Sequence, residues 1–219
     1  MRPSVRFTDK VAVVTGAKGN LGAAVCAAFE REGGRAVRVD LETNLLDQKK
    51  VDGRIAAVLE EHRRIHVLCN IAGGFRMGKP VHETTDEDWN FLFDVNVRTV
   101  LHTARAVVPH MIGAGGGKIV NMGAFAAQKG AAQMGAYVAS KSALIRLTET
   151  MAAELRDKDI NVNCVLPTIL DTPQNRADMP KADPKRWVAL EDAARAILFL
   201  ASDEAHAIHG AALPIPGLS

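Results

Sequence analysis

Short apolar runs rich in β-branched residues alternate along this chain with longer segments in which apolar residues recur every three or four positions. The short runs are typical of buried strands, and the periodic segments are typical of helices that cover a sheet. Strands are expected at residues 11–15, 35–40, 66–71, 118–122, 160–166 and 211–215, six or seven in all. Helices are expected at residues 21–32, 51–62, 85–111, 134–155 and 190–200. This order predicts an α/β fold, a Rossmann-type doubly wound parallel sheet with right-handed crossovers.

The chain length fits one domain. A single domain over residues 1–219 lies in the range that one α/β unit fills, and no internal repeat or linker divides it. Residues 171–187 are rich in proline and show neither the apolar period of a helix nor that of a strand. Because this segment is long for a connection, an irregular flap with a functional role is expected there.

Composition and charge exclude several classes of function. The formal net charge is +2, and clustered basic residues alternate with acidic ones, so nucleic-acid binding is not expected. No stretch approaches the ~18 consecutive apolar residues of a membrane span, and no secretion signal is visible. Three cysteines lie far apart among apolar neighbours, as buried thiols in a reducing compartment do: Cys26, Cys69 and Cys164. A cytoplasmic location without membrane contact is expected.

A glycine-rich turn, TGAKGNLG at residues 15–22, separates the first expected strand from the first expected helix. Glycine permits close backbone approach, and the amides of a helix N-terminus bind phosphate. An ordinary tight turn is the alternative, but this position is the one that the pyrophosphate of a dinucleotide requires. The residues expected to contact the cofactor here are Gly16, Lys18, Gly19, Asn20, Leu21 and Gly22.

Asp40 ends the second expected strand, close to the ~20-residue spacing at which a carboxylate accepts from an adenosine ribose. A 2′-phosphate beside this carboxylate would place two negative groups together, with Lys18 as the nearby cation. NAD is therefore expected as the cofactor in preference to NADP. A surface carboxylate at a strand end is the alternative reading of Asp40.

Tyr137 stands four residues before Lys141, so both side chains project from one face of the same expected helix. An ammonium beside a phenol stabilises the phenolate and lowers its pKa, which makes the tyrosine a usable proton donor or acceptor. Taken alone, such a pair is usually a solvated helix face. The nucleotide-binding turn upstream favours catalysis.

Five motifs follow one another along almost the whole chain: TGAKGNLG, NIAGG at 70–74, DVNV at 94–97, YVASK at 137–141 and LPTILDT at 166–172. Together they resemble the short-chain dehydrogenase/reductase family. The resemblance implies Tyr137 as catalytic acid/base, Lys141 holding the nicotinamide ribose and Asn96 supporting a proton-relay water. It also implies further cofactor contacts from Asn70, Ala72, Gly73, Pro167, Ile169 and Thr172.

Two departures from the family pattern are informative. Counted back from Tyr137, the family's catalytic serine falls on Ala124, so that hydroxyl is absent. The stretch between the second and third expected strands is short, as if one helix-strand unit were missing. The run around Gly123 and Ala124, AGGF at 72–75 and VLPTILDTPQNRADMP at 165–180 resemble the dihydropteridine reductase branch, although Asn96 departs from that branch.

Three functions, from two different classes, compete. The leading one is hydride transfer between the cofactor and a small carbonyl, imine or quinonoid substrate; the alternatives are dihydropteridine reductase proper, or a cofactor-binding protein with reduced turnover. His62 and His66 lack a third, carboxylate ligand, so no metal site is predicted. A homodimer or homotetramer through the two long helices is expected from their surplus of apolar residues. These are Trp89, Phe93, Val97, Leu144, Leu147 and Met151.

The substrate pocket is expected to combine apolar and polar side chains, which does not identify the substrate. Its expected lining is Phe75, Arg76, Met77, Gln128, Gln133, Met134, Met179 and Trp187.

Overall fold

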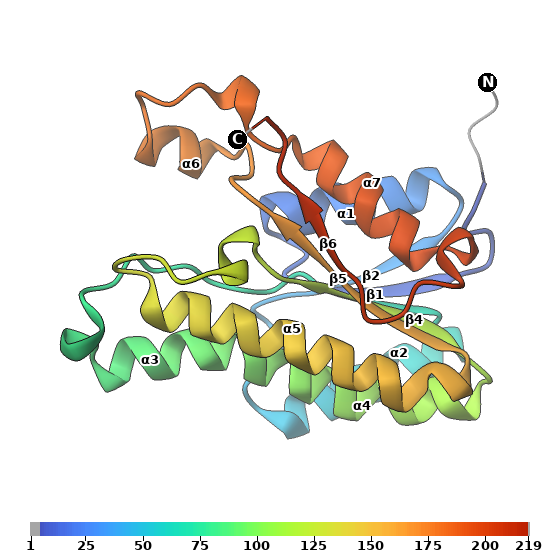
Figure 1. The fold of residues 1–219 in the computed structure, drawn as a ribbon. Coiled ribbons are helices and arrows are strands. Elements are labelled where there is room, and N and C mark those ends of the chain that lie inside the picture. The colour runs from blue at the N-terminus through green and yellow to red at the C-terminus, as the bar shows by residue number, and fades with distance from the viewer. Residues whose placement is uncertain (1–4, 219) are drawn as a thin grey trace.

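The computed structural model describes residues 5–218 and contains one six-stranded sheet in the order β2-β1-β3-β4-β5-β6, with every neighbouring pair parallel (Figure 1). The strands are β1 (Val11–Thr15), β2 (Arg35–Val39), β3 (Val67–Asn70), β4 (Gly117–Met122), β5 (Ile160–Pro167) and β6 (Ala212–Ile215). The expected parallel α/β sheet is therefore confirmed, with six strands in the described residues.

Helices cover both faces of the sheet. Helices α1 (Asn20–Arg31) and α7 (Leu190–Ala201) lie on one face, and α2 (Gln48–His62), α4 (Thr99–Gly113) and α5 (Gly135–Leu155) lie on the other (Figure 1). Strand β1 shows why its sequence is continuously apolar. Ala12 and Val14 pack against α1 and α7, whereas Val11 and Val13 face the α2, α4 and α5 layer.

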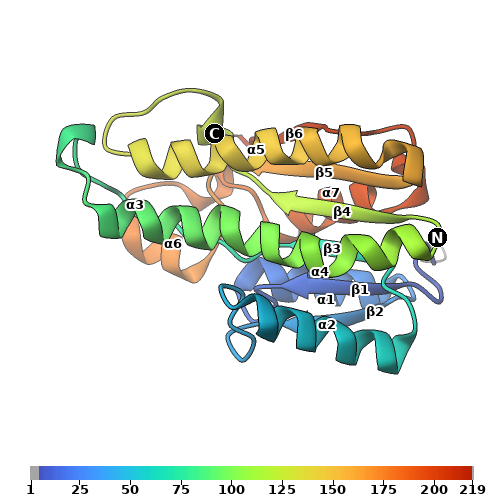
Figure 2. The ribbon, with the colours of Figure 1, turned by 90° about the horizontal axis from the view of Figure 1, so that it is seen from below.

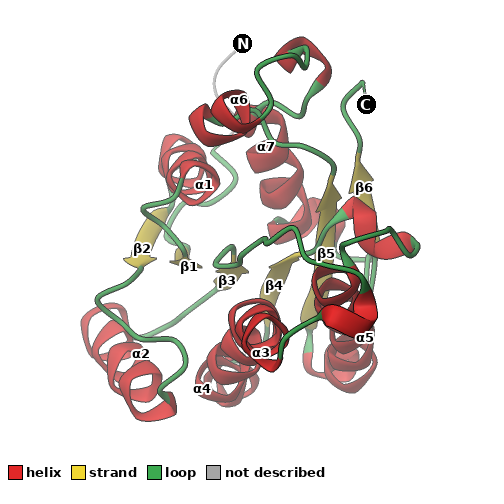
Figure 3. Cartoon of the chain, turned by 90° about the vertical axis from the view of Figure 1, so that its left-hand side faces the viewer, coloured by secondary structure: helices red, strands yellow, loops and turns green. Residues whose placement is uncertain are grey.

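The strand order reverses between β1 and β3. From the edge strand β2, helix α2 carries the chain back across β1 to β3, and no further strand is inserted among the described residues. The short stretch noted in the sequence thus forms one helix, α2, and no strand beyond β2 within the described residues. In open parallel sheets, ligands bind beyond the carboxyl ends of the strands at such a reversal. Figure 3 looks toward the carboxyl ends of the strands.

The helix expected at residues 85–111 is divided. Helix α3 (Asp86–Phe93) is followed by a π-helical turn at Asp94–Arg98 and then by α4, all along one line in Figure 2. Thr85 caps α3, because its Oγ1 accepts from the amide of Asp88 at 3.1 Å. The single π-turn carries Asn96, and such turns often occur at functional sites.

Residues 171–187 are more ordered than expected. They contain α6 (Pro173–Asp178), which Thr172 caps, and a short 3₁₀ turn at Pro184–Arg186. Arg176 holds Asp171 through two hydrogen bonds, at 2.6 and 2.8 Å. Trp187 is 7% exposed, so it packs under this segment and does not line an open pocket.

The long helices bury part of the surface expected to form an oligomer interface. Leu144 is 1% exposed and belongs inside the protein, so its assignment to an interface is wrong. Trp89 remains 43% exposed and stacks on Phe93 with ring centroids 4.6 Å apart.

The three cysteines are buried free thiols, as expected. Among residues 5–218, no helix has both the length and the apolar character of a membrane span.

Candidate active site

The glycine-rich turn between β1 and α1 has the shape of a phosphate cradle. Gly16 has φ +64°, and a Cβ there would lie 2.9 Å from the backbone N and Cα of Ala72. A Cβ on Gly22 would lie 2.1 Å from the carbonyl oxygen of Gly16. Gly19 caps α1 without a side-chain hydrogen bond, which leaves the first-turn amides open to a ligand. The turn therefore fits the pyrophosphate of a dinucleotide.

Three other residues of this turn differ in how they can contribute. The side chain of Leu21 is 6% exposed and packs in the apolar core, so only its backbone can contact a cofactor. Lys18 and Asn20 are exposed at the turn.

Asp40 lies against the turn, as its sequence position implied. One carboxylate oxygen accepts from the amide of Lys18 at 2.7 Å, and the other accepts from Leu41 at 2.9 Å. The Lys18 ammonium is paired with Glu42 at 2.8 Å, and this partner raises the pKa of Lys18. Glu42 was missed in the sequence because it lies in a polar stretch without period. Two carboxylates, those of Asp40 and Glu42, thus lie on the side of the turn where the adenosine is expected.

Tyr137 and Lys141 project from the first turns of α5, and both are largely buried. Burial raises the pKa of Tyr137 to about 12. Burial lowers the pKa of Lys141 to about 8, and its ammonium donates to the carbonyl of Met122 at 2.7 Å. The expected lowering of the phenol pKa by Lys141 is therefore not found in this structure. Tyr137 carries its proton at neutral pH.

Asn96 joins the π-turn to α5 and to the strand-end loop. Its Oδ1 accepts from the amide of Gly74 at 2.9 Å, and its Nδ2 donates to the carbonyl of Gly74 at 3.0 Å. The same Nδ2 donates to Ser140 at 3.1 Å, and Ser140 donates to the carbonyl of Tyr137 at 2.8 Å. Asn96 is 1% exposed, so these bonds fix the backbone around Tyr137.

Gly73 links the catalytic pair to the phosphate cradle. A Cβ on Gly73 would lie 3.0 Å from Asn96 Oδ1 and 3.2 Å from Lys141 Nζ. Its neighbour Ala72 is the residue that Gly16 approaches. The predicted cofactor and catalytic residues therefore meet along one short segment beyond β3.

The side chain of Asn70 is committed elsewhere. It accepts from Thr103 at 2.8 Å and donates to Asn121 at 2.9 Å, and Asn121 donates to Thr148 at 2.9 Å. All four side chains are buried and tie β3 and β4 to the helices beneath. The side chain of Asn70 is thus engaged inside the protein, and a contact of this residue with the cofactor stays a prediction.

Residues after β5 form the opposite wall. Pro167 ends β5, and the carbonyl of Ile169 accepts from Val188 at 2.8 Å. The Oγ1 of Thr172 accepts from the amide of Asn175 at 3.1 Å. These bonds fasten the wall to α6 and to the segment before α7. The contacts of Pro167, Ile169 and Thr172 with a cofactor remain predictions.

Ala124 follows β4 in extended backbone and is 5% exposed, with no hydroxyl of its own. Phe75 packs edge-on against the ring of Tyr137, with centroids 4.9 Å apart. A cavity of about 10 Å³ next to Tyr137 is lined in part by Gln133, Met134 and Arg76. Four residues of the expected substrate pocket thus gather beside the phenol, while Gln128 lies exposed after Ala124.

No group of three histidine, cysteine, aspartate or glutamate side chains that could hold a metal ion occurs in residues 5–218. His62 ends α2, and His66 lies beyond it, just before β3. The two histidines therefore do not share a helix face.

Comparisons with known proteins place the chain among oxidoreductases. A family model described as enoyl-(acyl carrier protein) reductase matches residues 9–217. D-threitol dehydrogenase from Mycolicibacterium smegmatis is 32% identical, over 97% of this chain and 93% of the relative. Dehydrogenase/reductase SDR family member 6 from Xenopus laevis is 31% identical, over 94% and 95%. Carveol dehydrogenase from Mycobacterium avium, solved with NAD, has a TM-score of 0.85 at 25% identity, over 97% and 98%.

These comparisons do not single out the dihydropteridine reductase branch, and they do not favour a protein that only binds its cofactor. They agree with the motifs and with the cradle, the tyrosine and the lysine described above. The chain belongs to the short-chain dehydrogenase/reductase family and is an NAD(P)-dependent oxidoreductase.

Proposed function

We propose that this enzyme uses NAD(H) to transfer hydride to or from a small carbonyl, imine or quinonoid substrate, with Tyr137 as the acid/base. The observation that carries the proposal is the position of Gly73, which lies between the Lys141 ammonium and the backbone that Gly16 approaches. A nicotinamide held there supplies or accepts the hydride. The glycine-rich turn would hold the pyrophosphate, and Lys141 the nicotinamide ribose.

Tyr137 would act first as an acid. Its pKa of about 12 keeps the phenol protonated at neutral pH, so it donates its proton to the substrate oxygen or nitrogen as negative charge develops there. In the oxidative direction the phenolate is the required form, and this structure disfavours that form.

Asn96 and Ser140 act as positioning residues. Their hydrogen bonds hold the carbonyl of Tyr137 and the loop at Gly74, so the phenol and the strand-end loop keep one relative position. Phe75 packs on the edge of the phenol ring and limits its rotation. Precise orientation of reacting groups lowers the activation barrier of many enzymatic reactions by several kcal/mol.

Ala124 restricts the range of substrates. A preorganised hydroxyl that donates to the substrate oxygen typically lowers a barrier by about 3 kcal/mol, or roughly a hundredfold in rate. Without it, substrates that are already electrophilic, such as quinonoid rings or conjugated imines, are favoured over simple ketones. Alternatively, the amide of Gln128 or Gln133 replaces the donor, and Gln133 is the one that shares a cavity with Tyr137.

NAD(H) is proposed over NADP(H) because Asp40 and Glu42 both stand beside the turn. We propose further that α4 and α5 form the interface of a homodimer or homotetramer. Leu101 and Ile112 on α4 are 38% and 42% exposed, which supports a partner on this side. Binding of nucleic acid or membrane is not proposed.

Tyr137→Phe tests the proposal directly. The variant lacks only the hydroxyl, so it should fold and bind NADH like the original while losing at least about a hundredfold in kcat on a panel of carbonyl and quinonoid compounds. Phe93→Leu, at a half-buried position of α3 that stacks on Trp89, provides a control that alters an aromatic side chain other than the phenol. Turnover by Tyr137→Phe within a few-fold of the original would disprove the assigned role.

A further inference from the structure

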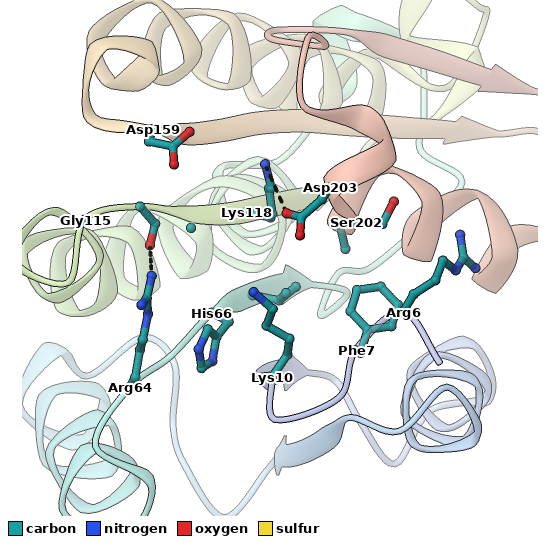
Figure 4. Close-up of a pocket in the computed structure, with 14 residues that line it drawn as sticks. Arg6, Phe7, Lys10, Arg64, His66, Gly115, Lys118, Asp159, Ser202 and Asp203 are labelled. Carbon is teal, nitrogen blue, oxygen red and sulfur yellow. Dashed lines mark hydrogen bonds and ion pairs between the residues drawn. The ribbon is translucent and has the colours of Figure 1, made fainter. Parts of the chain in front are cut away.

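A larger cavity, of about 100 Å³, opens at the amino-terminal edge of the sheet, opposite the candidate active site. Lys10 precedes β1, His66 precedes β3, and Lys118 is the second residue of β4. Figure 4 shows these side chains around the cavity, with Arg64 on one side and Asp203 on another. The volume is several times the ~15 Å³ that a single water requires. The cavity can therefore hold a small ligand.

Lys118 brings a buried positive charge to this cavity. Its side chain is 10% exposed, and its ammonium donates to the neutral amide oxygen of Asn161 at 2.6 Å. The nearest carboxylate, that of Asp203, is 4.0 Å away, and its side chain is 82% exposed. The buried ammonium thus lacks a buried anionic partner among the described residues. Burial is the main cause that lowers the pKa of Lys118.

Arg64 and Lys10 bring two further cations with spare donors. The Nε of Arg64 is buried and has no hydrogen-bond partner within residues 5–218. The guanidinium donates from Nη2 to the carbonyl of Gly116, at a long 3.5 Å. Lys10 is half-buried, and within residues 5–218 its ammonium makes no hydrogen bond or ion pair. Three cations therefore converge with unused donors.

His66 adds a neutral donor to the same wall. Its Nδ1 accepts from the amide of Val11 at 3.0 Å, so the proton resides on Nε2. Burial, together with Arg64 and Lys10, lowers the pKa of His66 to about 4, which keeps the ring neutral at pH 7.

The remaining charged groups around the cavity do not neutralise these cations. Arg6 forms an ion pair with Glu32 at 2.6 Å, so this pair adds no net charge to the cavity. Asp159 is 65% exposed and lies 3.8 Å from His206. Both aspartates of the lining, Asp159 and Asp203, are thus mostly solvated at the rim.

We propose that this cavity binds a tetrahedral oxyanion, either inorganic phosphate or the phosphate group of a small metabolite, through Lys10, Arg64 and Lys118. A guanidinium with a free Nε–H and two ammonium groups provide the charge-assisted donors that such an anion requires. The anion relieves the repulsion among the three cations. Because it binds only the folded arrangement of strand ends, it stabilises the fold by mass action.

Thermal unfolding with increasing inorganic phosphate, at ionic strength held constant with chloride, tests the proposal. The unfolding temperature should rise and saturate. Lys10→Gln should weaken phosphate affinity about tenfold, which is the effect of losing one charge-assisted bond. Since Lys10 has no partner to lose, the variant should be no less stable without phosphate. Lys49→Gln, the same change on the exposed face of α2, should keep the full response.

The glycine-rich turn also binds phosphate, so every titration is repeated with saturating NADH. The proposal is supported if phosphate still raises the unfolding temperature in the presence of NADH, and if both Lys10→Gln and Arg64→Gln weaken this rise. A response equal in Lys10→Gln and the original, or no rise beyond that with chloride, overturns it. Glycerol phosphate identifies the source: tighter binding than inorganic phosphate assigns the site to a phosphorylated metabolite, and weaker binding assigns it to the free ion.

Discussion

The Nζ of Lys18 lies 2.8 Å from Oε2 of Glu42, while the amide of Lys18 donates to Asp40 at 2.7 Å. The cation that stands nearest to Asp40 is therefore already engaged by a second carboxylate. A 2′-phosphate on the adenosine ribose would meet two negative groups, and Lys18 would have to leave Glu42 to compensate. These three residues are therefore the ones expected to set the proposed preference for NAD(H).

We predict that the enzyme binds NADH at least about tenfold more tightly than NADPH, as an uncompensated like-charge contact costs on the order of 1.4 kcal/mol or more. Asp40→Asn combined with Glu42→Gln should narrow this difference, because the change removes both carboxylates and frees Lys18. The difference in affinity is measured by titrating the enzyme with NADH and with NADPH and following the fluorescence of each cofactor, which gives the two dissociation constants. Glu60→Gln on the exposed side of α2 should change neither constant. Equal affinity of the original enzyme for the two cofactors would contradict the prediction.

Gly73 is predicted to be intolerant of even one methyl group. In Gly73→Ala the new Cβ would approach Asn96 Oδ1 to 3.0 Å and Lys141 Nζ to 3.2 Å, so one of them must move. A shift of reacting groups by less than 1 Å can cost up to about a hundredfold in rate, so kcat should fall at least tenfold. Steady-state kinetics with NADH measure the loss.

Gly53→Ala is the matched control for this change. Gly53 lies in α2, and nothing is within 4 Å of its Cβ position. Alanine there should leave kcat unchanged and raise the free energy of unfolding by about 0.5–1 kcal/mol. If Gly73→Ala retained full activity, the close packing of Asn96 and Lys141 around this glycine would be irrelevant to catalysis.

Lys141 is predicted to trade stability for function. Its pKa in the folded enzyme is about 8, below the usual 10.5 of lysine, so the unfolded chain binds this proton more tightly. The stability that it contributes is therefore full above pH 10.5 and is lost as pH falls through about 8. At pH 7 the buried ammonium destabilises the fold.

Lys141→Met should accordingly raise the free energy of unfolding at pH 7 by about 2 kcal/mol, allowing for the lost bond to Met122, and should abolish turnover. The gain should shrink as pH rises from 8 to 10.5. Urea unfolding across this pH range measures both effects. Lys49→Met on α2 controls for a general effect of replacing a lysine. A variant less stable than the original at pH 7 would show that the ammonium is favourable where it lies.

The strands were predictable because each is buried on both faces, which leaves a continuous apolar run in the sequence. Val11 and Val13 face one helix layer and Ala12 and Val14 the other, and no polar position interrupts them. The cradle was predictable for a similar reason, since Gly16 and Gly22 answer steric demands that any side chain would violate.

Other features depend on contacts that a sequence pattern does not carry. DVNV at 94–97 lies inside a longer segment with helical period, 85–111, which predicts an uninterrupted α-helix. The π-turn depends on the bonds of Asn96 to Gly74 and Ser140, which the pattern does not show. Likewise, the burial that raises the pKa of Tyr137 follows from the packing of α5 on the sheet and overrides the local i, i+4 pairing with Lys141.

Ala124 stands where the family resemblance places a catalytic serine, and its substitution gives the last prediction. The side chain at this place carries no hydroxyl, so under the proposed mechanism the phenol of Tyr137 alone protonates the substrate. We predict poor turnover of an aliphatic ketone and better turnover of a quinonoid dihydropterin, in which aromatisation of the ring drives hydride addition. Ala124→Ser should raise kcat/KM for the ketone by about ten- to a hundredfold, which is the usual worth of one preorganised donor.

The two substrates respond differently because they need the hydroxyl to different extents. A ketone oxygen develops negative charge that a second donor stabilises, so the added hydroxyl lowers that barrier; a quinonoid ring spreads its charge, so its rate should change less than threefold. Ala126→Ser, two residues further on in the same turn, separates a specific donor from a general effect of added polarity and should change neither rate. If wild type already reduced the ketone efficiently and Ala124→Ser changed nothing, the missing hydroxyl would not limit the reaction. A replacement donor would then be required, and Gln133→Leu, beside Tyr137, should abolish the ketone activity while leaving NADH binding intact.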